Sequence, residues 1–115
     1  MTNKTCTSTP VGVTLNVIGG KWKLLILWHL QTGPIRFGEL MKKMDGVTQK
    51  MLTQELRELE KDELILRKVF PVVPPHVEYS LTAYGKTLDP VLKTLCEWGE
   101  KHIMMKNTNS ATISL

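Results

Sequence analysis

The stretch TQKMLTQELRELEKDEL, residues 48–64, is rich in side chains that can pair with the edges of nucleic-acid bases. On an α-helix, at about 100° per residue, the polar residues share one face and the apolar ones share the other: Gln49, Lys50, Thr53, Gln54 and Arg57 against Met51, Leu52, Leu56 and Leu59. Glutamine and arginine can each form two hydrogen bonds, to adenine and to guanine respectively. The spacing predicts an amphipathic helix over 48–61, N-capped by Thr48, whose polar face has base-reading chemistry.

The charge of this helix needs an explanation. Residues 48–63 carry more acidic than basic side chains, although the whole chain has a net charge of +4. The acids concentrate in the C-terminal half, whereas recognition helices contact bases with their N-terminal residues. Glu55 alone points into the apolar face, and we expect it to pair with a cation or to lie at the edge of the core. A polar helix face that is merely solvated remains the alternative.

Positive charge gathers in other segments, since residues 21–43 hold five basic residues and one acid, Glu39. The predicted contacts to the DNA backbone are Lys21, Arg36, Lys42, Lys43, Arg67, Lys68 and His76, and Lys23 is a further candidate. Such contacts give affinity but carry little sequence information.

The elements around the predicted helix indicate one domain of a mainly α class with a small β-hairpin. Thr9-Pro10 starts a first helix and Gly19-Gly20 ends it; an apolar helix over 21–31, expected to be buried, and a short helix over 37–44 follow. Strands are predicted at 35–36, 65–70 and 77–81, with a three-proline loop between the last two, and Thr82 caps a final helix. This order is a winged helix-turn-helix, with 65–81 as the wing. Residues 1–8 are expected to be a flexible arm, 9–106 the domain and 107–115 a flexible tail.

Other chemistry finds little support in the sequence. The three histidines have no metal-ligand spacing, and glycine motifs for nucleotides or nucleophilic serines are missing, so we expect no enzyme, cofactor or metal site. Neither a signal peptide nor a membrane span is predicted, and Cys6 and Cys96 form no CxxC pair. These features favour a cytoplasmic protein.

An ordered series of motifs resembles the HxlR family, bacterial winged-helix transcription regulators related to the MarR type. The motifs are GGKW (19–22), RFGEL (36–40), TQKMLTQELRELE (48–60) and PPHVEYSLT (74–82), followed by Gly85, Leu88, Pro90 and Trp98. The resemblance implies a homodimer on double-stranded operator DNA, with an interface built by the first and last helices. Their apolar residues fit that role independently: Val11, Leu15, Ile18, Leu88, Val91, Leu92, Leu95 and Trp98. Dimer symmetry predicts an inverted-repeat operator.

Three positions depart from the family pattern. Many members carry a cysteine where this chain has Thr9, and the cysteine here is Cys6, so a redox-sensor role for Cys6 competes with that of an ordinary arm cysteine. Glu63 stands where glycine is usual and a positive φ is often needed. His76 stands where lysine or arginine is common.

Two alternatives stay open. A winged helix can serve as a protein-interaction module without specific DNA binding. For a DNA-binding regulator, the sequence does not decide between repressor and activator, or whether a thiol-reactive compound, another small effector or nothing controls it.

Overall fold

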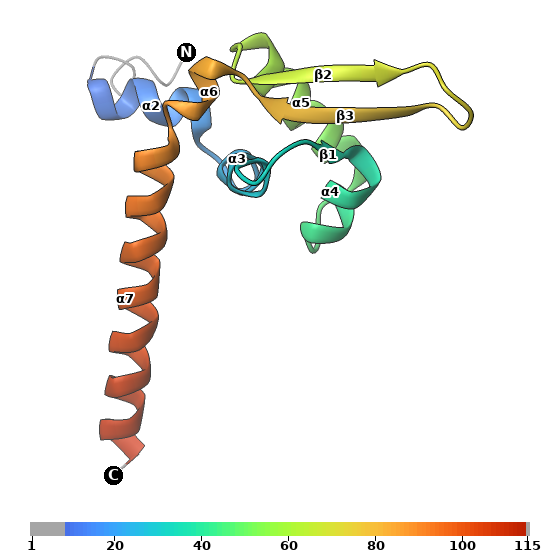
Figure 1. Ribbon diagram of the computed structural model, residues 1–115. Helices are drawn as coiled ribbons and strands as arrows, with labels where there is room; N and C mark the ends of the chain where they lie inside the picture. Colours follow the sequence, from blue (N-terminus) through green and yellow to red (C-terminus); the bar gives the residue numbers. More distant parts are fainter. Residues whose placement is uncertain (1–8, 115) are drawn as a thin grey trace.

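The computed structural model describes the backbone of residues 9–114 and the side chains of residues 9–108. Along the chain lie α2 (Pro10–Ile18), α3 (Lys23–Leu30), β1 (Ile35–Arg36), α4 (Phe37–Lys43), α5 (Gln49–Lys61), β2 (Ile65–Phe70), β3 (His76–Leu81), α6 (Ala83–Lys86) and α7 (Asp89–Ser114). A compact body with a projecting hairpin carries a long C-terminal helix at one side (Figure 1). The fold class predicted from the sequence, a winged helix-turn-helix, is confirmed.

The core lies where α3, α4 and α5 meet the base of the sheet. Its most deeply buried side chains are Ile26, Leu27, Leu30, Leu40, Leu52, Leu56, Leu59 and Ile65. Fully burying one such aliphatic side chain contributes about 1.5–3 kcal/mol. The turn between α4 and α5 contains Gly46 with φ 89°, a conformation that favours glycine. The two helices of the helix-turn-helix are therefore fixed by shared burial and by this turn.

Helix α3 is buried on one side only, which differs from the prediction of a helix buried all round. Ile26, Leu27 and Leu30 face the core, but Leu25 and Trp28 are exposed. The rest of the described chain does not cover that side of α3, so its apolar surface is left open.

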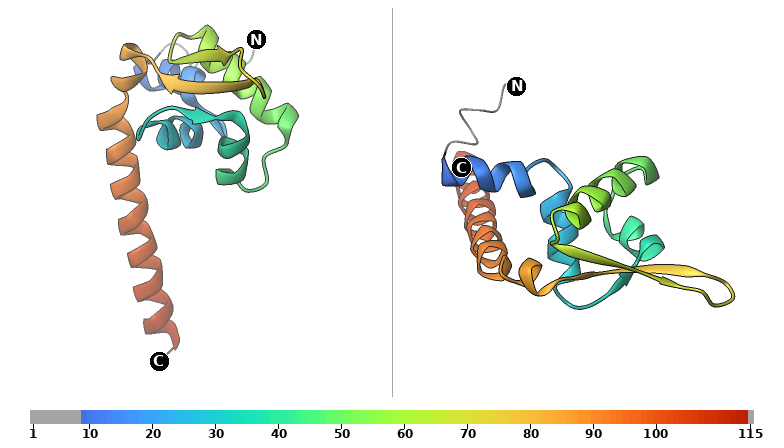
Figure 2. Two further views of the ribbon diagram at one scale, coloured as in Figure 1. Left: turned by 45° about the vertical axis from the view of Figure 1, so that its right-hand side comes forward. Right: turned by 90° about the horizontal axis from the view of Figure 1, so that it is seen from above.

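The sheet has the order β1-β3-β2 and is antiparallel throughout. Strand β3 pairs with β2 along its whole length, from Ile65 opposite Leu81 to Phe70 opposite His76. Strand β1 pairs only with the two central residues of β3, with Ile35 opposite Tyr79 and Arg36 opposite Glu78. The wing is thus joined to the start of α4 through the middle of β3, and its tip extends beyond that point as a two-stranded hairpin (Figures 1 and 2).

Helix α5 ends in a backbone motif that normally uses glycine. Glu63 has φ 62°, its N–H donates to the Glu60 carbonyl at 2.9 Å, and the Leu64 N–H donates to the Leu59 carbonyl at 3.0 Å. This is the Schellman arrangement. The expected positive φ at Glu63 is confirmed, and a side chain occupies it.

The end of the chain is organised differently from the prediction of a single final helix. Thr82 caps the short α6, and the N–H groups of Thr87 and Leu88 bond three residues back, to Tyr84 and Gly85. Pro90 has no N–H to donate, so a continuous α-helix cannot form here. A separate helix, α7, begins at Asp89 and ends at Ser114. Much of α7 stands clear of the body (Figures 1 and 2).

Within residues 9–114, no single helix has the length and apolar character needed to cross a bilayer. Helices α2 and α3 reach that composition only when taken together, and they are bent by 76° with respect to each other.

Candidate nucleic-acid interface

All six residues predicted to read bases reach the surface of α5. Thr48 forms the N-cap, and its hydroxyl accepts a hydrogen bond from the Met51 N–H at 3.1 Å. Gln49, Lys50, Gln54 and Arg57 are exposed, while Thr53 is half-buried. Because α5 buries Leu52, Leu56 and Leu59, this polar face must point outward. The amphipathic helix inferred from the spacing is therefore present, with the expected N-cap.

Two shallow hollows adjoin on this face. One, of about 490 Å³, is lined entirely by α5: Gln49, Lys50, Thr53, Gln54 and Arg57. The other, of about 620 Å³, lies between α5, the start of α4 and the wing, and is lined by Arg36, Phe37, Gly38, Glu39, Lys42, Gln49, Thr53, Pro75, His76 and Val77. Gln49 and Thr53 line both. The polar face of α5 thus continues into a surface shared with α4 and the wing.

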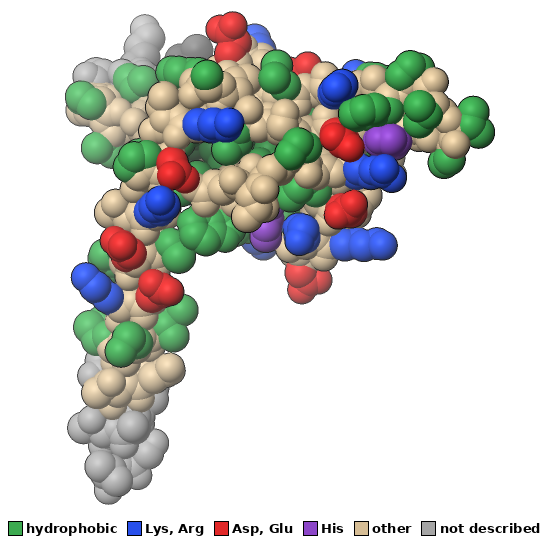
Figure 3. Space-filling model, in the orientation of Figure 1, with side chains coloured by type: hydrophobic (Ala, Val, Ile, Leu, Met, Phe, Trp, Pro, Cys, Tyr) green, Lys and Arg blue, Asp and Glu red, His purple; other side chains and the backbone are tan. Residues whose placement is uncertain are grey.

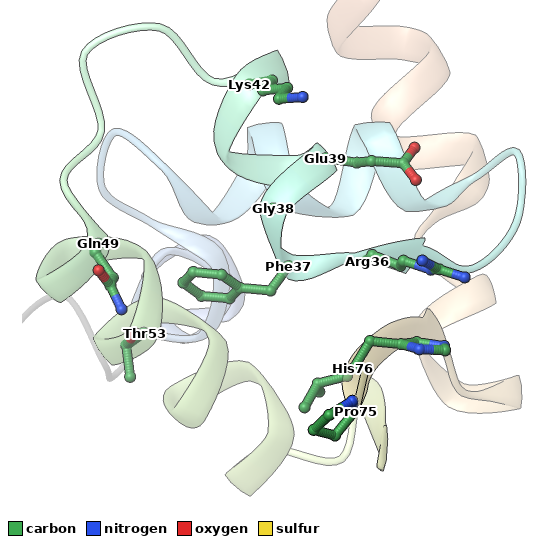
Figure 4. Close-up of a pocket in the computed structure, with 10 residues that line it drawn as sticks. Arg36, Phe37, Gly38, Glu39, Lys42, Gln49, Thr53, Pro75 and His76 are labelled. Carbon is green, nitrogen blue, oxygen red and sulfur yellow. The ribbon is translucent and has the colours of Figure 1, made fainter. Parts of the chain in front are cut away.

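The second hollow brings together three of the predicted backbone contacts, Arg36, Lys42 and His76. In Figure 4, Phe37 points toward Gln49 and Thr53, whereas Arg36 and His76 point the other way. Figure 3 shows Lys and Arg side chains gathered over α4 and the wing, with acids and a His among them. Lys21, Lys43, Arg67 and Lys68 are exposed as well but line neither hollow.

The two basic residues in the middle of β2, Arg67 and Lys68, lie on opposite faces of the wing. Lys68 lies opposite Glu78 in register, with its ammonium 4.9 Å from the centre of the Phe70 ring. That ring stacks on His76 at 4.5 Å, and His76 Nε2 lies 3.7 Å from a Glu78 oxygen. Side chains alternate along a strand, so Arg67 belongs to the opposite face. Arg67 and Lys68 therefore present their positive charges on opposite faces of the wing.

Lys23 has a different role from the phosphate contact considered for it. Its side chain lies against α5, with Nζ 2.5 Å from Glu58 Oε1 and 3.9 Å from Glu55 Oε1, and the residue is 8% exposed. The prediction for Glu55 is confirmed, since this cation is its partner at the edge of the core. A buried lysine that is neutralised by two carboxylates is not available to DNA.

The same contacts lower the pKa of Glu58. Hydrogen bonds from the Lys23 ammonium and the Gln54 amide hold the pKa of the Glu58 carboxyl below its ordinary value. Two of the acidic residues that made α5 look unsuited to DNA, Glu55 and Glu58, are thus paired with Lys23 of the same protein.

On α3, the pKa of His29 is lowered, mainly by burial and also by the nearby positive charge of Lys43.

Sequence reasoning missed Glu58 and Phe37 as parts of this site. The link between Gln54 and Glu58 is an i, i+4 pair and could have been found from helical spacing alone. The contact to Lys23 spans 35 residues and depends on how α3 packs against α5, so no local signal indicates it.

A second surface consists of exposed apolar side chains on the terminal helices. Of the residues predicted for the dimer interface, Val11, Leu15, Val91, Leu95 and Trp98 are exposed and Leu88 is half-buried. Ile18 and Leu92 are 3% and 4% exposed in the core of this chain, so they offer a partner almost no surface. The sequence missed Val13, Leu25, Trp28, Ile103, Met104 and Met105, which are also exposed on these helices and α3. Cys96 of α7 is half-buried and free.

Among the described residues, no three His, Cys, Asp or Glu side chains gather in a way that could hold a metal ion. Cys6 lies outside the described residues, and nothing in the structure bears on its predicted sensor role.

Comparison with known proteins places these surfaces in context. The profile of the family described as HxlR-like helix-turn-helix matches residues 17–107. The uncharacterized HTH-type transcriptional regulators YdeP and YtcD of Bacillus subtilis strain 168 are 54% and 56% identical over 93 residues, which is 81% of this chain and 73% and 74% of theirs. Among solved structures, the redox regulator HypR in its reduced form superposes with a TM-score of 0.81 at 46% identity, over 87% of this chain and 99% of that chain.

Proposed function

The chain belongs to the HxlR-like helix-turn-helix family of transcriptional regulators, and from that premise we propose that it binds double-stranded operator DNA as a symmetric homodimer. Its relatives are regulators and not enzymes. In the proposed complex, α5 enters the major groove with its N-terminal half, and the wing (65–81) contacts the neighbouring backbone.

The observation that carries the proposal is the exposed row on α5. Gln49, Lys50, Thr53, Gln54 and Arg57 line one hollow, and no acid lines it. The row includes four residue types that recognise bases: glutamine for adenine, arginine and lysine for guanine, and threonine for either. A helix face that is merely solvated would not need these groups to be aligned, four of the five within the N-terminal half of α5.

Phosphate contacts come from the elements on either side of that row. Arg36 and Lys42 lie across the second hollow from Gln49 and Thr53. A groove-bound helix has phosphates on both sides, so cations at this position add affinity for any sequence.

The homodimer is supported by the apolar surface of the terminal helices. Trp98 is 66% exposed, and Val11, Leu15, Leu95, Ile103 and Met104 add further apolar area. Large apolar side chains exposed in such number on a monomer often mark an interaction surface. A second copy offers the same surface, and a two-fold axis buries both at once. Two copies then present two α5 helices to an inverted repeat, with half-sites one helical turn apart or a multiple of it.

The first test is selection of duplexes from a random DNA library by the full chain, followed by fluorescence anisotropy with excess unrelated competitor. We expect an enriched inverted repeat whose affinity survives the competitor. If the selection enriches no sequence, the proposal is overturned. The remaining interpretation would then be a winged helix that serves as a protein-interaction module.

Redox control is the second candidate, favoured by the similarity to HypR, which is named a redox regulator. Cys6 is the residue that would carry it. A mild thiol oxidant should then change the DNA affinity of the native chain and of Cys96→Ser, but not of Cys6→Ser. Identical responses in the native chain and Cys6→Ser would eliminate this role.

A further inference from the structure

The carboxylate of Glu58 joins a buried lysine to a base-reading glutamine. Its Oε1 accepts from Lys23 Nζ at 2.5 Å, and its Oε2 accepts from Gln54 Nε2 at 2.7 Å. One oxygen is thus bonded to a residue of α3 and the other to a residue of the row on α5. Gln54, Glu58 and Lys23 form a chain of contacts from the recognition face to the core.

The hydrogen bond from Gln54 to Glu58 fixes the orientation of the Gln54 amide. An ionised carboxylate can only accept hydrogen bonds, so it must face the NH₂ end of the amide and not its oxygen. The lowered pKa of Glu58 keeps it ionised at neutral pH. Without such a partner, an exposed glutamine would rotate its amide freely between the two orientations.

The groups left on Gln54 match one base. One N–H is taken by Glu58, so one N–H and the carbonyl oxygen remain. Adenine presents an acceptor and a donor in the major groove, N7 and the N6 amino group, and a glutamine can satisfy both. Guanine presents two acceptors there, which would leave the glutamine oxygen without a donor.

The buried lysine makes the orientation persistent. An exposed i, i+4 pair alone contributes only a few tenths of a kcal/mol to a helix. Lys23 is nearly buried, and its ammonium is confined between Glu58 and Glu55. Because Lys23 belongs to a core helix, Glu58 is held by the fold and not by the flexible surface.

We propose that Glu58, held by Lys23, is a positioning residue that presents the Gln54 amide for recognition of an adenine in each half-site. This inference rests on the proposed DNA binding. It assigns to an acidic residue of the recognition helix a part in sequence specificity, without direct contact to a base.

The test compares base preferences, position by position, by selection from a random duplex library with the native chain and variants. Gln54→Ala identifies the base pair that Gln54 reads. Glu58→Gln keeps the size of the side chain but can donate or accept, so it no longer dictates the amide orientation. Glu60→Gln is the matched control, because it removes a charge from the same helix and, among the described residues, Glu60 has no ion pair or side-chain hydrogen bond.

We expect Glu58→Gln to lose the preference for adenine, about tenfold for a bidentate contact, at the base pair that Gln54→Ala identifies, and to retain the preferences elsewhere. Equal base preferences in Glu58→Gln and Glu60→Gln would overturn the inference and leave the proposed function intact. A uniform loss at every position would also overturn it, since Glu58 would then be merely structural. If the native chain enriches no sequence, it is the proposed function that fails.

Lys23→Met provides a second route if Glu58→Gln does not fold. It keeps an unbranched stem in the core but releases Glu58. Weakened adenine preference at the same base pair supports the inference, and an unchanged preference contradicts it.

Discussion

Lys23 of α3 and Glu58 of α5 form a hydrogen-bonded ion pair, with Nζ 2.5 Å from Oε1, that connects the core helix to the recognition helix. Because Lys23 also lies 3.9 Å from Glu55, this one cation offsets part of the surplus of acids on α5. The pair also makes part of the stability of the fold depend on pH.

The pH dependence follows from the lowered pKa of Glu58, whose ordinary value is 4.5. The unfolded chain binds a proton at this group before the folded chain does, so the stabilisation is present above that value and is lost as pH falls through the lower, folded pKa. We expect Glu58→Gln to flatten the fall in unfolding free energy on acidification below about pH 5. Urea unfolding at fixed protein concentration measures it. Glu60→Gln should keep the native slope, and equal slopes in all three proteins would refute the role of the pair.

Arg57→Ala should weaken specific binding much more than non-specific binding. Arg57 lines the hollow on α5 and can form two hydrogen bonds to a guanine edge, worth about 1–3 kcal/mol. Anisotropy titrations on the selected duplex and on unrelated DNA give both affinities. Lys61→Ala, one turn further along, is the control and should change little. Equal losses on both duplexes would assign Arg57 to the backbone contacts.

Lys42→Ala should reduce the salt dependence of binding. Lys42 lies across the second hollow from the recognition row, where a phosphate would be neutralised. Losing one phosphate contact lowers the slope of log affinity against log salt by roughly one. Lys93→Ala serves as the control, because Lys93 pairs with Asp89 on α7 at 3.4 Å. A slope that matches the native one would remove Lys42 from the phosphate contacts.

Glu63→Gly should stabilise the fold by about 1 kcal/mol, because Glu63 occupies a left-handed backbone conformation that glycine adopts without strain. Denaturant unfolding at fixed protein concentration measures the change. Asp62→Gly provides a contrast, since Asp62 has φ −82° and gains nothing from glycine. Destabilisation by Glu63→Gly would mean that the strain at Glu63 is offset elsewhere.

Trp98→Asp should dissociate the proposed homodimer. A charge at this exposed indole would be buried without a partner in a two-fold interface, at a cost of several kcal/mol. Sedimentation across a range of concentrations reports the change in mass. Val73→Asp is the matched control, because Val73 is 98% exposed at the tip of the wing, away from α2 and α7. A native chain that sediments as a monomer would contradict the homodimer itself.

The helices and the wing were predictable because their signals are local. Apolar spacing defined α5, the Thr9-Pro10 and Thr48 caps set the starts of α2 and α5, and the prolines of residues 71–75 separated the strands. The exposed row on α5 follows from the same periodicity.

The residues that sequence reasoning misplaced depend on packing between distant segments. Ile18 and Leu92 were assigned to a dimer surface because helix patterns cannot distinguish a core from an interface, and both are apolar. Lys23 was counted with the phosphate contacts because its partners lie more than 30 positions away. The break before α7 was indicated by Pro90 but was not recognised.

The short pairing of β1 with β3 gives the wing two mechanical regimes. At Glu78 and Tyr79, β3 has a paired strand on each side. From Val77 toward the tip of the wing, it is paired with β2 alone. We therefore expect the hairpin to be more rigid where β3 pairs with both neighbours than toward its tip. In the proposed complex, bending near the tip would let the wing follow a groove of varying width while α5 keeps its position.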